Sequence, residues 1–243
     1  MKKASSSGFS LVEMSIVIVV MALIVAAAMQ GVNMIEKAKL RNVLSEISDI
    51  KMAINSFKTK YDKLPGDFDK AVAYWGATTE NGDADGKIEF VNGSTIYEGY
   101  RAWQHLAYAQ MVKTPYLGTE TTGAAELGKD VPESKIGGGY FVEYDIFGLT
   151  EMTSLAFGVP VATSVAPILV NGVITPAQAQ ELDNKVDDGE PMTGTVRGAD
   201  GNGSASNTCI NAGADTTDGT SDDYYNITLD GKDCTMAFKL LDG

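Results

Sequence analysis

The chain of 243 residues has 32 acidic and 19 basic side chains, a formal net charge of −13, and 44% hydrophobic residues. This acidity argues against a nucleic-acid partner, because phosphates would be repelled. The single histidine, His105, and the lack of GxSxG, HExxH and P-loop motifs leave no catalytic constellation. We therefore expect a protein that is not an enzyme.

A short basic leader, residues 1–8, precedes the most apolar part of the chain. It contains Lys2 and Lys3 and ends at Gly8. The following run, residues 9–30, is long enough to cross a bilayer as a helix, which needs about 20 residues. Its polar residues before Met29 are Ser10, Glu13 and Ser15.

Glu13 is the acid within this run, and two roles are open for it. An acid near the centre of a membrane helix costs about 2.5 to 3.5 kcal/mol on insertion scales, so it marks a functional partner. Ser10 and Glu13 also have the spacing of a capping box, with Ser10 as N-cap. Pairing with a partner and capping of the helix can each apply at a different stage.

Beyond Gly31 the apolar residues become periodic. They recur every three or four residues, at Leu40, Val43, Leu44, Ile47, Ile50, Ile54, Phe57 and Tyr61. This spacing predicts that the helix continues through residues 31–64 with an amphipathic face, which must pack on a soluble domain. Pro65 and Gly66 predict that it ends near Leu64.

Residues 65–243 are expected to form one globular, mostly β head. Strands are expected at 87–91, 140–147, 155–161, 225–229 and 235–240, and short helices at 100–112 and 175–186. The second helix has Pro176 at its first position and Gln178 placed to close a capping box. The predicted fold class is α+β, a long N-terminal helix packed on a mostly antiparallel sheet with short helices.

An oxygen-rich loop at 81–89 is similar to the calcium loop of EF-hands. The candidate ligands are Asn81, Asp83, Asp85 and Lys87. Position twelve is Asn92 instead of a bidentate glutamate, so sensor-like affinity is not expected, whereas millimolar affinity needs fewer charges. The loop is therefore a candidate site for calcium as a cofactor, and the alternative is a solvated turn rich in Asp and Asn.

A second acidic cluster follows at the end of the expected helix at 175–186. It consists of Asp183, Asp187, Asp188 and Glu190. Asp183 and Asp187 share a helix face and repel each other, which a cation or Lys185 would relieve. A solvated helix end is the favoured interpretation.

The leader, Gly8, Phe9, Glu13 and the apolar run to Met29 together resemble the start of type IV prepilins and of type II secretion pseudopilins. The resemblance implies that a membrane peptidase cuts after Gly8 and that the new terminus, Phe9, is N-methylated. It also implies that Glu13 neutralises the terminal amine of a neighbouring subunit in a filament.

Cys209 and Cys234 are the two cysteines of the chain. If the head crosses the membrane, both enter an oxidising compartment, where disulfides persist. Pilins commonly close a C-terminal loop with a disulfide, so the resemblance implies a bridge between these two residues. Two free buried thiols are the alternative.

The resemblance implies a structural subunit of a type IV pilus-like filament, a homo- or hetero-polymer processed by a prepilin peptidase and methylase. Before assembly the chain would lie in the inner membrane as a single-pass protein with its head in the periplasm. A pseudopilin of a type II secretion system is the alternative. A secreted soluble domain with an ordinary signal peptide, cut near Ala26 to Ala28, is a third interpretation.

Overall fold

The computed structural model describes residues 10–89, 97–118, 125–146, 152–161, 170–201, 204, 206–211 and 223–240. Its contacts divide the chain into two compact units, Met1–Asn42 and Val43–Gly243. In the described residues the first unit is helical, and the second contains the rest of that helix together with the head.

A single helix, α1 (Leu11–Tyr61), covers 51 residues. In the first unit its large apolar side chains between Leu11 and Ile35 are exposed, and its most apolar window has a mean hydropathy of 2.7. By length and composition this part of α1 can span a membrane.

The second part of α1 belongs to the unit that begins at Val43 and is amphipathic, as its periodicity predicts. Its buried positions are Val43, Ile47, Ile50, Ala53, Ile54 and Phe57. The helix ends at Tyr61, earlier than expected from Pro65, because Asp62 has a φ of 54°, a left-handed conformation that terminates a helix.

The main sheet of the head is antiparallel and confirms the predicted fold class. Its strands have the order β1-β2-β7-β4, with β3 paired to β2, and β5 and β6 form a second small sheet. The strands are β1 (Gly139–Tyr144), β2 (Thr153–Pro160), β3 (Val170–Asn171), β4 (Val196–Asp200), β5 (Ile210–Asn211), β6 (Tyr224–Tyr225) and β7 (Cys234–Lys239).

The register gathers large apolar side chains on one face of the main sheet. Tyr140 lies opposite Phe157, and Phe157 lies opposite Met236, so these three side chains share a face. The rings of Tyr140 and Phe157 are stacked with centroids 5.2 Å apart, and all three residues are buried. This face forms the centre of the core.

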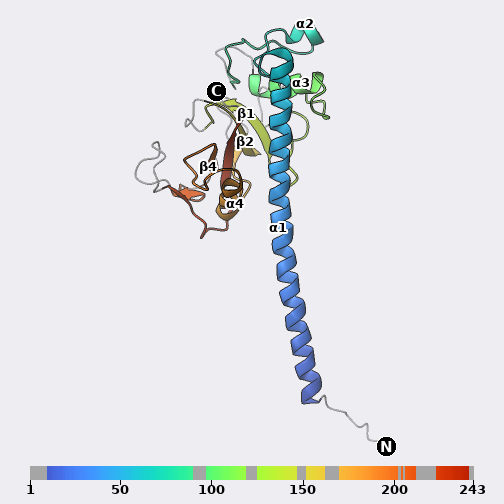
Figure 1. The fold of residues 1–243 in the computed structure, drawn as a ribbon, viewed down its shortest axis with the longest axis vertical. Coiled ribbons are helices and arrows are strands. Elements are labelled where there is room, and N and C mark those ends of the chain that lie inside the picture. Colours follow the sequence, from blue (N-terminus) through green and yellow to red (C-terminus); the bar gives the residue numbers. More distant parts are fainter. Residues whose placement is uncertain are drawn as a thin grey trace, which may run out of the picture. The chain divides into compact units, whose positions relative to one another are not determined.

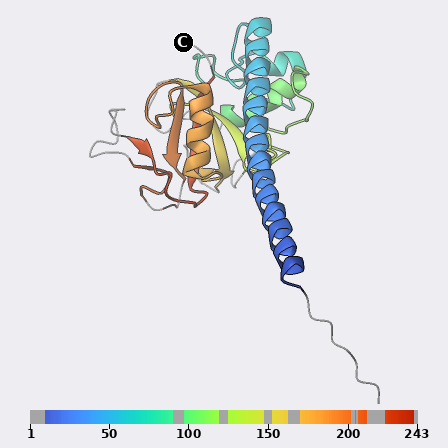
Figure 2. The ribbon, with the colours of Figure 1, turned by 60° about the horizontal axis from the view of Figure 1, so that its bottom comes forward.

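Three helices complete the head: α2 (Ala71–Trp75), α3 (Glu98–Tyr108) and α4 (Pro176–Val186). In Figure 1, α2 and α3 lie beside the C-terminal end of α1. Helix α4 contacts β4, β6 and β7, and Figure 2 shows it across the sheet. The expected capping box is present, since Thr175 Oγ1 accepts from Gln178 N and Gln178 Oε1 accepts from Thr175 N.

Some expected boundaries were wrong. The strand expected at 225–229 stops at Tyr225, because the chain turns there with Leu229 N donating to Asn226 O. Residues 87–89 are not a strand, and 90–91 lie outside the described residues. Helix α3 spans Glu98–Tyr108 instead of 100–112, and Gln110, with a φ of 59°, cannot continue it.

Glu46 connects α1 to β1 through hydrogen bonds. Its Oε2 accepts hydrogen bonds from Tyr140 Oη and Ser134 Oγ, both at 2.8 Å. Burial strongly raises the pKa of Tyr140, so its hydroxyl remains a donor at neutral pH. The carboxylate therefore satisfies two side chains that are both buried.

Replacement of Glu46 by Ala is expected to destabilise the head by about 1 to 3 kcal/mol, the usual cost of leaving a buried polar group unsatisfied. Denaturant unfolding of the full chain in detergent measures this loss. The matched control is Asp49→Ala, which changes an exposed acid on the same helix and is expected to have little effect. Equal stability of both variants would contradict the role of Glu46.

Candidate functional site

The start of α1 forms the capping box that the sequence predicts. Ser10 N donates to Glu13 Oε2 at 2.7 Å, and Glu13 N donates to Ser10 Oγ at 3.2 Å. Gly8 and Phe9, where processing is expected, lie outside the described residues. Within a single chain Glu13 thus takes part in the capping box of its helix, and its side chain is exposed.

An exposed apolar surface extends along α1 in the first unit, on both sides of Glu13 in the sequence. Its members that are more than half exposed include Leu11, Val12, Ile16, Ile18, Val19, Leu23, Ile24, Met29, Met34 and Ile35. A contiguous apolar surface of this kind marks a membrane or protein contact. It needs a bilayer or other apolar helices around it.

Three carboxylates meet in the head at the loop that follows α2. Asp67, Asp83 and Asp85 each place an oxygen within 4.8 Å of the others, a spacing at which one cation can bind all three. Asp67 is buried, whereas Asp83 and Asp85 are exposed. We call these three residues the acidic triad.

The structure assigns different roles to the four calcium ligands that the sequence suggests. Asp83 and Asp85 belong to the triad. Asn81 does not point to it, because its Oδ1 accepts the amide of Val72 at the start of α2. Lys87 N donates to Asp85 Oδ1, and the ammonium of Lys87 lies 4.5 Å from the centre of the Tyr144 ring.

The spacing of the loop does not identify Asp67 as a site residue, because Asp67 lies well before the loop. The triad also includes no residue from α3, but Glu98 of that helix lies directly beside it. Glu98 Oε1 accepts from Asp83 N and Glu98 Oε2 accepts from Glu89 N, so both oxygens hold the loop backbone. The capture of two loop amides makes Glu98 a residue that positions the triad.

Burial governs the electrostatics of this region. It raises the pKa of Asp67 to about 6 and that of Glu98 to about 7, and neighbouring carboxylates add to both shifts. Hydrogen bonds from backbone amides oppose the shifts in part. Lys63 is the basic group that contributes at Asp67, and its Nζ donates to Ala84 O in the same loop.

The second predicted cluster comes together as well, through Asp183, Asp187 and Asp188. Its carboxylates accept bonds from their own surroundings: Asp183 Oδ2 from Tyr225 Oη at 2.8 Å, and Asp187 Oδ2 from the amides of Thr195 and Val196. Glu190 is not among these three carboxylates, and its amide donates to Asp188 Oδ1. The cluster thus serves to hold the loop after α4.

Cys209 and Cys234 form a disulfide, as the sequence suggested. Both residues are buried, and the bond ties the start of β7 to the residue before β5. Closing a loop of this size stabilises a fold by roughly 3 kcal/mol in the chain-entropy model. The residues between β5 and β6 at 212–222 lie outside the described residues.

His105 is a buried structural residue. Its Nδ1 accepts from Gly66 N at 2.9 Å, so its Nε2 carries the proton toward Glu80 O at 3.1 Å. Its ring stacks on Phe57 of α1. Burial lowers the pKa of His105 to about 4.

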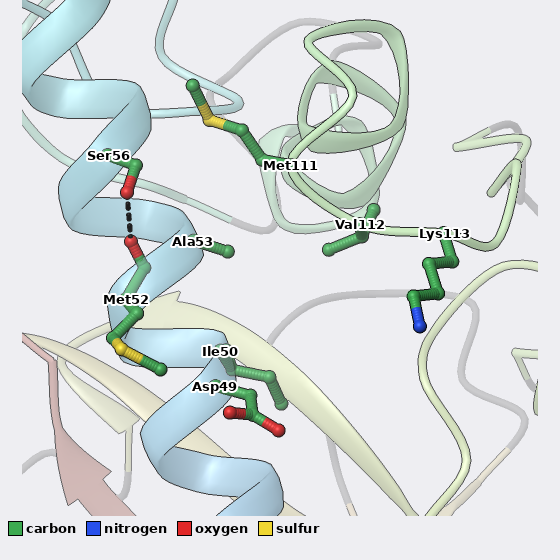
Figure 3. Close-up of a pocket in the computed structure, with 8 residues that line it drawn as sticks. All are labelled: Asp49, Ile50, Met52, Ala53, Ser56, Met111, Val112 and Lys113. Carbon is green, nitrogen blue, oxygen red and sulfur yellow. Dashed lines mark hydrogen bonds between the residues drawn. The ribbon is translucent and has the colours of Figure 1, made fainter.

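An open groove of about 560 Å³ lies between α1 and the segment after α3, and Figure 3 shows its lining. Ser56 is the hydroxyl in this lining, and its Oγ donates to Met52 O instead of to a base. The charged groups in the lining are Asp49 and Lys113. This arrangement does not form a nucleophile activated by a neighbouring base.

Comparison with protein families finds a match for the N-terminal segment. Residues 3–29 match the family model described as the prokaryotic N-terminal methylation motif. The match confirms that this segment carries the methylation motif on which the expected resemblance rests. Its boundaries include Gly8, Phe9 and Glu13.

The comparisons for the whole chain are weaker. One solved structure that is similar is the major type IV pilin PilA1 from Clostridium difficile, at 15% sequence identity and a TM-score of 0.36. The similarity covers 86% of this chain and 98% of that one. A TM-score this low does not establish a shared fold. No curated protein matches the chain.

The environment of His105 predicts a specific loss of stability in acid. The unfolded state binds a proton below pH 6.5, whereas folded His105 binds one only near pH 4, so this contribution falls as the pH drops through that window. The loss reaches about 3 kcal/mol, since one pKa unit corresponds to about 1.4 kcal/mol.

Urea unfolding of the full chain and of His105→Gln, in detergent between pH 7.5 and 4, isolates this effect, because both proteins share their carboxylates. The stability advantage of the wild type over the variant is expected to shrink below pH 6.5. A difference that stays constant across this range would contradict the assignment.

Proposed function

We propose that the protein is a structural subunit of a type IV pilus-like filament, processed after Gly8 and assembled through its N-terminal helix. The observation that carries this proposal is the exposed apolar surface from Leu11 to Ile35, most of which lies within the methylation motif at residues 3–29. Such a surface has no use in a soluble monomer, but it suits a helix that moves from a bilayer into the core of a polymer.

Processing supplies the partner for Glu13. Cleavage after Gly8 creates a charged amine at Phe9, which N-methylation leaves charged. Inside an apolar filament core both this amine and an unpaired carboxylate are costly, and together they neutralise each other. Assembly then pairs the Glu13 carboxylate of one subunit with the terminal amine of its neighbour.

The same proposal sets the location and the partners. The newly made chain lies in the inner membrane as a single-pass protein, with its head on the periplasmic side. There a prepilin peptidase and methylase acts on it, and it joins a homo- or hetero-polymer of pilin-like subunits. The disulfide between Cys209 and Cys234 suits an oxidising location.

A pseudopilin of a type II secretion system is the second candidate function, since the N-terminal motif serves both classes. The acidic triad favours it, and the C-terminal disulfide favours the pilus. Both candidates share the processing and pairing steps. They differ in whether the filament extends from the cell surface or stays in the periplasm.

The pairing role of Glu13 is tested by two substitutions that separate charge from capping. Glu13→Gln keeps an oxygen that can accept from Ser10 N, so it preserves the capping box, but it removes the charge. Glu13→Ala removes both. We expect both variants to be cleaved and inserted in the membrane, and both to lose at least tenfold in filament incorporation.

Incorporation is measured by immunoblotting sheared or isolated filaments against the membrane fraction, in cells without the wild-type subunit. If Glu13→Gln assembles normally while Glu13→Ala does not, capping is the function and pairing is wrong. Ser15→Ala, which changes another polar residue of the same segment, is the control that should assemble.

We also propose that the head binds calcium at the loop 81–89. Three carboxylates and loop oxygens are hard ligands, which suit calcium or magnesium. Calcium also accepts a less regular arrangement of ligands than the octahedral one that magnesium requires. The exposure of Asp83 and Asp85 leaves the loop open to ions from the surroundings.

Calcium is expected to raise the melting temperature of the full chain in detergent. A concentration ten times the dissociation constant stabilises by about 1.4 kcal/mol, which corresponds to a few degrees for a head of this size. Scanning calorimetry at pH 8 in millimolar CaCl2, in MgCl2 and in EGTA measures the shift. Equal melting temperatures in CaCl2 and EGTA would contradict calcium binding.

A further inference from the structure

The backbone brings two distant segments into direct contact at the acidic triad. Gly82 N donates to Phe68 O at 3.0 Å. A Cβ atom on Gly82 would lie 2.3 Å from Gly66 O and 2.4 Å from Asp67 Cα, so a side chain at this position is excluded. This close approach places the residue after Gly82, Asp83, beside the residue after Gly66, Asp67.

The hydrogen bonds of the buried Asp67 carboxylate do not compensate fully for its burial. It has no exposed surface, and its Oδ2 accepts from Gly86 N at 3.1 Å. Its Oδ1 is buried and has no hydrogen-bond partner among the residues that the structure describes. A buried carboxylate with an unsatisfied oxygen is costly unless a cation compensates for it.

Hydrogen bonds already hold the rest of the loop in place. Asp85 N donates to Asp83 Oδ1, and Lys87 N donates to Asp85 Oδ1, so two successive turns fix the carboxylates of the loop. Ala84, with a φ of 65°, allows the tight backbone between them. Glu98 holds the loop from the α3 side through the amides of Asp83 and Glu89.

We propose that Asp67 is a ligand of the bound calcium ion, together with Asp83 and Asp85, so that the ion links the segment after α1 to the loop before α3. This inference rests on the proposed calcium binding. It replaces Asn81, whose oxygen is occupied by Val72 N, with a residue outside the loop. Oxygens that bind one calcium ion at 2.3 to 2.6 Å lie at most about 5 Å apart, which the triad satisfies.

An ion bound by the triad would connect parts of the head that are distant in the sequence. Asp67 lies six residues after the end of α1, and the loop lies between α2 and α3. An ion at the triad therefore ties the end of the long helix to the helices packed against it. Calcium would fix the part of the head nearest to the C-terminal end of α1.

The test uses Asp67→Asn in the full chain in detergent at pH 8. The amide oxygen can still accept from Gly86 N, but the charge is lost. Asp69→Asn, an exposed acid two residues on, is the matched control. Calcium binding is measured by isothermal titration, and melting temperatures are measured in CaCl2 and in EGTA.

We expect Asp67→Asn to lose at least tenfold in calcium affinity and to lose the rise in melting temperature with calcium, while Asp69→Asn behaves as the wild type. In EGTA the variant should melt no lower than the wild type, because it lacks an uncompensated buried charge. A variant that unfolds or melts much lower in EGTA would show that Asp67 is needed without an ion, and it would overturn the inference.

Two other results separate the failure of this inference from the failure of the proposed calcium binding. If the wild type binds calcium and Asp67→Asn binds it equally well, Asp67 is not a ligand, and the proposed calcium binding stands without it. If the wild type does not bind calcium, both the calcium proposal and this inference fail. The filament function is unaffected in either case.

Discussion

The exposed apolar surface at the start of α1 is the constraint on which the rest of the structure depends. Removal of one large aliphatic side chain from water contributes about 1.5 to 3 kcal/mol, and this surface carries many of them between Leu11 and Ile35. Water is therefore an unsuitable environment for this half of the helix. The proposed function gives it two apolar environments in succession, the bilayer and the filament core.

The other half of α1 packs within the head. Phe57 packs among Phe68, Trp75 and His105, with ring centroids 5.8 to 6.3 Å apart. Glu46 adds polar ties to the side chains beside β1. One helix thus carries an apolar surface for partners and a face that belongs to a folded domain, which is what a filament subunit with a soluble head requires.

Local patterns in the sequence predicted the parts of the fold that local interactions decide. The periodicity from Val43 to Phe57 gave the amphipathic helix, and Thr175 with Gln178 gave the start of α4. Strand β4, by contrast, was not expected. Its sequence Val-Arg-Gly-Ala-Asp has low β propensity, and it is a strand because it pairs with β7.

In the candidate calcium site too, local sequence patterns identify some of the residues and long-range contacts determine the rest. Asp83 and Asp85 were found from the spacing of the loop, which is a local property. Asn81 fits the same spacing, but its Oδ1 accepts a hydrogen bond from the nearby amide of Val72. Asp67 could not be found from spacing, because only the close approach of Gly82 to the chain after α1 brings it to the loop.

In the proposed function, cleavage after Gly8 releases the helix for assembly, and the amino terminus of the mature protein reports where the chain was cut. The measurement is mass spectrometry of the protein purified from its native membranes, with sequencing of the N-terminal peptide. The account predicts a chain that begins with N-methylated Phe9. A chain that begins near Met29 would show cleavage by an ordinary signal peptidase and would contradict the assembly of a filament through α1.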